Sequence, residues 1–258
     1  MQDRVKQLEG VVNFRDFGGY LGFDGAMLRR GLLFRSAHFA EASDGDLDAL
    51  DQLGVGAVTD LRRPEEREAQ PNRWPRGGVF VHQNDEGQVS KPPHVAFLEE
   101  AELSAEAVRG YMLGTYGQIP YEPRYLNLFS AFLRGLVQTQ RAGVVHCAAG
   151  KDRTGIIVAV TQLLLGVDRA AVYADYELTN TVVDLEARLP RMRSIIEARY
   201  GVAVTDEVAR PMVGVHADYL KTALDAIEGR SGSIELYART EMGLSVAEIS
   251  QLRGLLLQ

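Results

Sequence analysis

A single cysteine occurs among the 258 residues, so no disulfide can form within the chain, and a reducing compartment fits this usage. No apolar run reaches the roughly 18 residues of a membrane-spanning helix, which excludes stable membrane insertion. Positive charge is scarce: 28 lysines and arginines oppose 35 aspartates and glutamates, and the formal net charge is −7. This balance argues against general nucleic-acid binding and against strong attraction to an anionic membrane surface.

The five histidines are scattered without the spacing of zinc ligands, so no metal site is expected. Residues 1–10 are charged and contain no apolar core, which predicts a protein that is cytoplasmic or secreted without a cleaved signal peptide. No repeat, low-complexity tract or obvious linker interrupts the remaining sequence. We therefore expect one domain over residues 1–258.

Strand and helix patterns alternate along the chain. Short apolar runs predict buried strands, and i, i+3, i+4 spacing predicts helices. The strands are expected at 55–61, 79–82 and 144–146, and the helices at 44–53, 125–137, 154–165 and after the capping box of Ser245 and Glu248. Residues 21–34 predict a hairpin turning at Asp24-Gly25. Together these patterns predict an α/β fold with a partly parallel sheet covered by helices.

Residues 90–120 form a separate excursion between a predicted strand and a predicted long helix. A Lys91-Pro92-Pro93 turn signal opens it, and apolar residues then follow at helical spacing. Those residues are Val108, Tyr111, Met112 and Tyr116. Two interpretations stay open: the segment belongs to the helical layer, or it is a lid over a site, since insertions of this length are often functional.

The chemistry concentrates in residues 144–155, where a predicted strand runs through a short loop into an apolar helix. Cys147 ends the strand, and Arg153 follows six positions later at the start of the helix. A helix N-terminus offers unpaired N–H groups and partial positive charge, which bind an anion and stabilise a thiolate. The expected phosphate-binding residues are Ala148, Ala149, Gly150, Lys151, Asp152 and Arg153.

A lone cysteine is more often an inert small hydrophobic residue. That interpretation leaves unexplained why Gly150, Arg153 and Thr154 stand at fixed offsets from Cys147 on a strand-to-helix turn. The sequence therefore favours Cys147 as a nucleophile beneath a bound phosphate. His146 is expected either to orient the loop through a hydrogen bond or to be a satisfied core histidine.

Residues 146–154 match the His-Cys-x5-Arg-Ser/Thr signature of the protein tyrosine phosphatase superfamily. Residues 13–19, 60–62 and 215–220 resemble a bacterial branch that includes mycobacterial and lipid-active enzymes. This resemblance covers most of the chain. It implies a cysteine-dependent phosphomonoesterase that needs no metal or cofactor. It also implies a four- to five-stranded, mostly parallel sheet flanked by helices, with an inserted helical lid.

The signature assigns roles to individual residues. Cys147 attacks phosphorus and forms a phosphocysteine, while Arg153 and the loop amides hold the phosphoryl oxygens. Thr154 donates its hydroxyl to the sulfur as the thiolate departs. Asp60 and Arg62 are expected to form a structural ion pair, and Arg15 is also expected to be structural.

The general acid stays open between Asp152 in the loop and Asp85 just after the strand at 79–82. Asp152 could instead be structural, and Asp85 could be a solvated loop residue. Trp74-Pro75-Arg76 resembles the Trp-Pro-Asp loop that carries this acid in many family members. We reject it because its third residue is a cation and because it precedes the strand it should follow.

The expected substrate is phosphotyrosine or mixed protein phosphoesters. A phosphoinositide is the alternative, since Lys151 adds a second cation to the loop. A catalytically inactive phosphate-binding module is the alternative of another class, although a binder has no need of the thiol. A sulfur transferase also uses a cysteine loop, but the Arg153-Thr154 pair at the helix start disfavours it.

Overall fold

The computed structural model describes residues 4–73, 78–86, 97 and 104–258. In this part of the chain, five strands form one sheet in the order β1-β2-β5-β3-β4. The strands are β1 (Arg15–Asp16), β2 (Leu33–Ser36), β3 (Val55–Asp60), β4 (Phe80–His82) and β5 (Ala142–His146). Only β1 runs antiparallel to its neighbour. The five-stranded, mostly parallel sheet confirms the predicted fold class.

Helices make up most of the remaining described residues. They are α1 (Asp44–Gln52), α2 (Pro64–Ala69), α4 (Ala105–Gln118), α5 (Pro123–Thr139), α6 (Asp152–Leu164), α7 (Arg169–Glu177), α8 (Thr179–Val182), α9 (Leu185–Tyr200), α10 (Asp206–Val213), α11 (Ala217–Ser231), α12 (Ile234–Thr240) and α13 (Val246–Leu256). The described residues also contain the 3₁₀ turns η1 (Phe23–Gly25), between β1 and β2, and η2 (Ile119–Tyr121), between α4 and α5. Among the described residues, no helix is long and apolar enough to cross a membrane.

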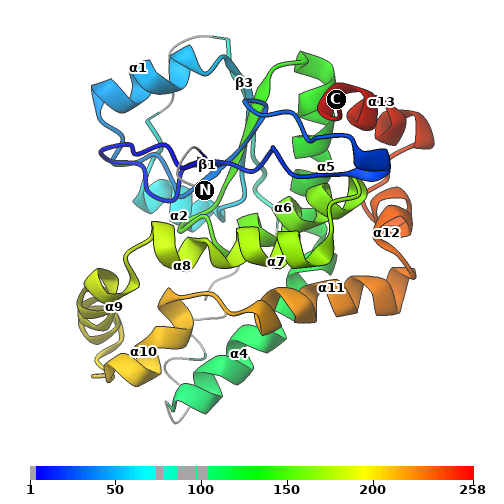
Figure 1. The fold of residues 1–258 in the computed structure, drawn as a ribbon. Coiled ribbons are helices and arrows are strands. Elements are labelled where there is room, and N and C mark those ends of the chain that lie inside the picture. Colours follow the sequence, from blue (N-terminus) through cyan, green and yellow to red (C-terminus); the bar gives the residue numbers. More distant parts are fainter. Residues whose placement is uncertain (1–3, 74–77, 87–96, 98–103) are drawn as a thin grey trace.

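Alternate residues along a strand point to opposite faces of the sheet, and helices cover both faces. On one face Phe34 and Val144 pack in a cluster with α1, and on the other Leu33 and Val145 pack with α5 and α6. Figure 1 shows α1 and α5 on opposite sides of the strands. Helix α6 is apolar nearly all round and is buried along most of its length, as its sequence predicts.

The register of the strands brings three carboxyl ends together. His146, the last residue of β5, lies beside Ser36 at the end of β2 and Asp60 at the end of β3. Open α/β sheets bind their ligands just beyond this edge. The loop that follows His146 therefore starts at the position where the fold favours a site.

Two local predictions can be compared with the structure. Asp24 and Gly25 turn the chain with φ of 55° and 75°, Leu21 bridges Met27, and the antiparallel pairing continues irregularly from there to β1 and β2. The next apolar run, β2, enters the middle of the sheet because its side chains are buried on both faces. The strand predicted at 79–82 forms as β4, but it lies at the edge of the sheet and Phe80 is 66% exposed.

The excursion at 90–120 is described from Ser104 onward, together with Phe97. Helix α4 packs against α10 and α11, and it buries Val108 and Tyr116 completely. Its ring at Tyr111 stacks on Phe97 with 4.5 Å between centroids. This part of the excursion therefore belongs to the helical layer. Residues 90–96 and 98–103, with the Lys91-Pro92-Pro93 turn, lie outside the described residues, so the lid at 90–120 stays a prediction.

Candidate active site

Cys147 begins the loop that joins β5 to α6. Its side chain is 1% exposed, and the loop ends at Lys151, one residue before the helix starts. Gly150 turns the loop with φ of +67°, and a Cβ there would lie 2.2 Å from the Ser36 carbonyl oxygen. Only glycine fits this position, because the backbone is left-handed and the neighbouring strand is too close. Position 150 thus sets the curvature of the loop around Cys147.

Buried side chains hold the carbonyl groups of the loop. Asn13 Nδ2 donates to the carbonyl oxygens of Ala149 (3.1 Å) and Gly150 (2.9 Å), and Arg35 Nη2 also donates to Gly150 (2.9 Å). Within the described residues, the N–H groups of 148–151 donate no hydrogen bond. Unpaired N–H groups at a helix N-terminus form an anion-binding concavity. The loop at 148–151 therefore forms a cradle of this shape, and phosphate binding by residues 148–153 stays a prediction.

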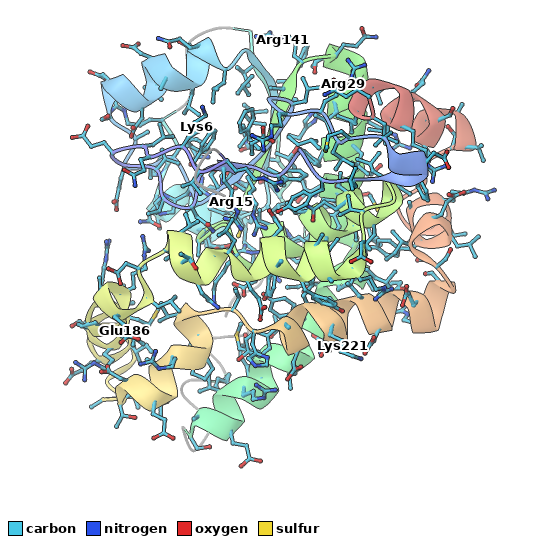
Figure 2. The ribbon with its side chains drawn as sticks, in the orientation of Figure 1. Lys6, Arg15, Arg29, Arg141, Glu186 and Lys221 are labelled. Atoms are coloured by element: carbon cyan, nitrogen blue, oxygen red, sulfur yellow. The ribbon has the colours of Figure 1, made fainter. Side chains whose placement is uncertain are left out.

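A second layer of buried polar groups supports Asn13. Arg15 donates to the Asn13 side chain and to the Asp175 carbonyl and Thr179 hydroxyl at 3.1 and 3.0 Å. Figure 2 labels Arg15 near the centre of the molecule, above α7 and α8. Burial and the nearby Arg35 lower the pKa of Arg15 to about 9. Arg15 is structural, as predicted, but its structural role is to hold the loop. The roles of Asn13 and Arg35 were not predicted, although Asn13 lies in one of the family-like segments.

Arg153 stands in the first turn of α6 with its guanidinium in a two-pronged ion pair. Its Nη1 and Nη2 lie 2.6 and 2.7 Å from the two carboxylate oxygens of Glu66 on α2, and Nη1 also donates to the Leu61 carbonyl at 3.2 Å. Burial opposes the charge, but the Glu66 carboxylate raises the pKa of Arg153 well above its ordinary value. Arg153 is therefore a fixed cation. The role of Glu66 was not predicted, because its partner Arg153 lies 87 residues away in the chain and no local pattern indicates the pairing.

Asp152 and Lys151 have partners on different helices. The Asp152 carboxylate accepts a 2.7 Å hydrogen bond from the Tyr116 hydroxyl of α4, and its side chain is 24% exposed. Lys151 Nζ donates to the carbonyls of Met212 and Gly214 at the end of α10. Lys151 is 6% exposed, so most of its side chain is committed to α10.

Thr154 is completely buried in the first turn of α6. Within the described part of the chain, its hydroxyl has no hydrogen-bond partner. A buried hydroxyl without a hydrogen-bond partner destabilises the folded state. A group that binds later can remove this cost by accepting a hydrogen bond from the hydroxyl. The predicted donation from Thr154 to the sulfur of Cys147 stays a prediction.

His146 lies directly beneath the loop and is fully buried. Its Nδ1 is 3.2 Å from the Cys147 carbonyl oxygen, its Nε2 is 3.3 Å from Asn72 Nδ2, and its ring meets Phe39 edge to face. Burial lowers the pKa of His146 to about 4, although Asp60 opposes this shift. His146 is therefore neutral near pH 7. The predicted Asp60–Arg62 ion pair is present, with 2.8 Å between the charged atoms.

Asp85 lies in a more open environment than Asp152. Its carboxylate is 81% exposed and pairs with Arg67 of α2. With Arg62, Asn72 and Gln83, it lines a cavity of about 340 Å³ beside α2. In the described residues, no hydrogen bond joins Asp85 to the loop at 147–153. The rejected segment Trp74-Pro75-Arg76 lies outside the described residues.

The loop carries the His-Cys-x5-Arg-Thr pattern on which the predicted resemblance rests, and comparison with known proteins identifies the class of enzyme. The family described as the tyrosine phosphatase family matches residues 6–258. The chain belongs to that family, and the predicted resemblance and enzyme class, a phosphoric monoester hydrolase, are confirmed.

Individual relatives cover nearly all of the sequence. The triple specificity protein phosphatase PtpB of Mycobacterium tuberculosis is 32% identical, over 98% of this chain and 99% of that protein. A protein of Cupriavidus necator, provisionally named a tyrosine-protein phosphatase, is 31% identical over 95% of this chain and 85% of its own length. A tyrosine-protein phosphatase of Nostoc commune is 26% identical over 85% and 72% of the two chains.

Proposed function

We propose that the protein hydrolyses phosphotyrosine, with broader activity on protein phosphoesters, through a phosphocysteine intermediate on Cys147. The observation that carries this proposal is the cradle at 148–151. Among the described residues its N–H groups donate no hydrogen bond, while Asn13 and Arg35 hold the carbonyls of Ala149 and Gly150. Arg153 completes the cradle with a planar fork that suits two phosphoryl oxygens. The name of the Mycobacterium tuberculosis relative supports a specificity wider than phosphotyrosine.

The reaction proceeds in two steps. The Cys147 thiolate attacks phosphorus, so an S–P bond forms while the P–O bond to the leaving group breaks. A carboxylic acid supplies the proton that the leaving oxygen takes. Water then attacks phosphorus, the S–P bond breaks, the same carboxylate accepts the proton of the water, and the thiolate is regenerated with the Thr154 hydroxyl donating to it. Arg153 and the loop amides stabilise the charge of both transition states.

We propose Asp152 as the group that exchanges this proton, with Asp85 as the separate candidate. Asp152 follows the cradle directly, and Tyr116 orients its carboxylate. Asp85 is exposed and paired with Arg67. Each Asp→Asn variant would be tested on phenyl phosphate, which needs protonation, and on 2,4-dinitrophenyl phosphate, which does not. The acid is the residue whose loss lowers turnover about 100-fold or more on the first substrate only.

The substrate class is decided by measuring phosphate release in EDTA from three substrates: a phosphotyrosine peptide, a phosphoserine peptide and a monophosphorylated inositol lipid. A Cys147→Ser variant is the control for each. Release from the peptides that disappears in the variant supports the proposal. Fastest release from the lipid would favour the phosphoinositide alternative. Phosphate binding without release from any substrate would indicate a binding module.

A further inference from the structure

We infer that Tyr116, on helix α4, is a positioning residue that holds the Asp152 carboxylate in its working orientation. This inference rests on the proposed function, in which Asp152 exchanges the proton. In the part of the chain that the structure describes, the hydrogen bonds of the Tyr116 hydroxyl go to Asp152 and Tyr176 and none goes to residues 148–151. It acts on the reaction only through Asp152, from a helix that begins 47 residues before Asp152 in the chain.

The hydroxyl of Tyr116 lies between two oxygen atoms. It is 2.7 Å from Asp152 Oδ1 and 2.6 Å from the hydroxyl of Tyr176 on α7. A hydroxyl carries one proton, so when Tyr116 donates to the carboxylate, Tyr176 must donate to Tyr116. The two tyrosines form a directed chain that ends at Asp152. Such a chain strengthens its last hydrogen bond, because each donor polarises the next.

Both rings are held by packing. Tyr116 is 0% exposed and Tyr176 is 1% exposed, and Tyr116 packs at 5.5 Å on the ring of Tyr219 from α11. The Tyr176 ring occupies the space beside Gly155, where a Cβ would lie 2.8 Å from it. Neither hydroxyl can swing away without opening the core. Because both tyrosines are held in place, the hydrogen bond from Tyr116 also fixes the orientation of the Asp152 carboxylate.

The surroundings leave Tyr116 as the strongest neutral donor to Asp152. Lys151 Nζ is 3.5 Å from the same oxygen, but it is already bound to two carbonyls at the end of α10. Burial and the Asp152 carboxylate raise the pKa of Tyr116 well above its ordinary value, so its hydroxyl keeps the proton that it donates. The Asp152 side chain is still 24% exposed, which leaves it open to substrate and water.

The test uses Tyr116→Phe, which removes the hydroxyl and keeps the ring. Tyr237→Phe is the matched control, since Tyr237 is also fully buried and donates a 2.6 Å hydrogen bond to the Pro120 carbonyl, far from the loop in sequence. We expect Tyr116→Phe to lower kcat on phenyl phosphate about tenfold with KM unchanged, and to leave 2,4-dinitrophenyl phosphate hydrolysis nearly unchanged. Tyr237→Phe should change thermal stability without changing either rate.

A double-mutant cycle separates the possible failures. If Tyr116 acts through Asp152, adding Tyr116→Phe to Asp152→Asn lowers kcat no further. Equal effects of Tyr116→Phe and Tyr237→Phe, or a full tenfold loss in the Asp152→Asn background, would overturn the inference and leave the role of Asp152 standing. If Asp152→Asn alone leaves phenyl phosphate turnover unchanged, the proposed role of Asp152 fails, and the inference fails with it. Retained Cys147 chemistry would then still support the phosphatase function.

Discussion

The phosphate loop and the helix pair α9–α10 are stabilised in different ways. The loop at 147–151 is held by buried polar side chains from β1, β2 and the segment before them, and it packs against the main core. Helices α9 and α10 share a small cluster of their own, in which Leu189, Ala209 and Val213 are the buried members. Figure 1 shows the pair at the periphery, beside α4.

Lys151 connects the two regions. It belongs to the loop, yet its amino group binds carbonyls at the end of α10, where the helix dipole favours a cation. Within the described residues, the side chains of Asn13 and Arg35 hold the loop, and Lys151 joins it to the end of α10. We therefore expect local opening to be more frequent in the α9–α10 pair than in the loop.

The largest effect is expected at Arg153, because its fork serves the transition state. Arg153→Lys keeps the charge but cannot bind two oxygens in one plane. We expect kcat/KM on a phosphotyrosine peptide to fall about 1,000-fold. Steady-state kinetics measures this, with thermal unfolding as the control for folding. A loss below about tenfold would show that charge alone suffices in the cradle.

His146 makes the loop region sensitive to acid. Its pKa is about 4 in the folded protein and about 6.5 when exposed, so the unfolded state binds a proton that the folded state excludes. Stability from this group is complete above about pH 6.5 and is lost as the pH falls toward 4, by about 3 kcal/mol at most. Urea unfolding at pH 7 and pH 4.5 measures the difference. His146→Gln should flatten this pH dependence, and an unchanged slope would contradict the assignment.

Gly150→Ala places a Cβ against the Ser36 carbonyl in a left-handed conformation. We expect the free energy of unfolding to fall by about 2 kcal/mol and turnover to fall with it, since the cradle must shift. Gly25→Ala is the matched control: Gly25 has φ of +75° with no atom within 4 Å of its Cβ position. Gly25→Ala should lower the free energy of unfolding by about 1 kcal/mol and leave turnover unchanged. Equal turnover in the two variants would show that the close approach to Ser36 is unimportant.

Glu66→Gln keeps the shape of the side chain that orients Arg153 but removes its charge. We expect kcat to fall about tenfold, because the guanidinium becomes less well fixed in the cradle. The comparison variant is Glu68→Gln, an exposed change on the same helix, α2. Phosphatase assays on both variants give the result. If the two variants are equally active, the cradle orients Arg153 without Glu66.

The smallest expected effect is a difference in amide hydrogen exchange between two regions of the unmodified protein. Amides of α9 and α10 should exchange faster than those of β5 and α6, because the small cluster around Leu189 opposes local opening with little buried apolar area. Mass spectrometry of peptic peptides measures this. Equal protection in the two regions would remove the contrast between them.

The sequence allowed prediction of several features that depend on near neighbours. The loop between Cys147 and Arg153, the buried helix after it and the capping box at Ser245 were all predicted, and the structure contains each. Their signals lie within about a dozen residues, so spacing and polarity suffice. The hairpin predicted at 21–34 turns at Asp24-Gly25, and its antiparallel arms reach as far as β1 and β2.

The remaining features depend on partners far apart in the chain. Asn13 meets Gly150 across 137 residues, and Arg153 meets Glu66 across 87. The placement of Tyr116 against Asp152 follows from how α4 packs on α10 and α11. The sequence by itself predicted the candidate nucleophile, the loop around it and several strands of the sheet, because these follow from local pattern. Only the tertiary structure decided what holds them in place, because buried polar groups must find partners wherever the packed chain supplies them.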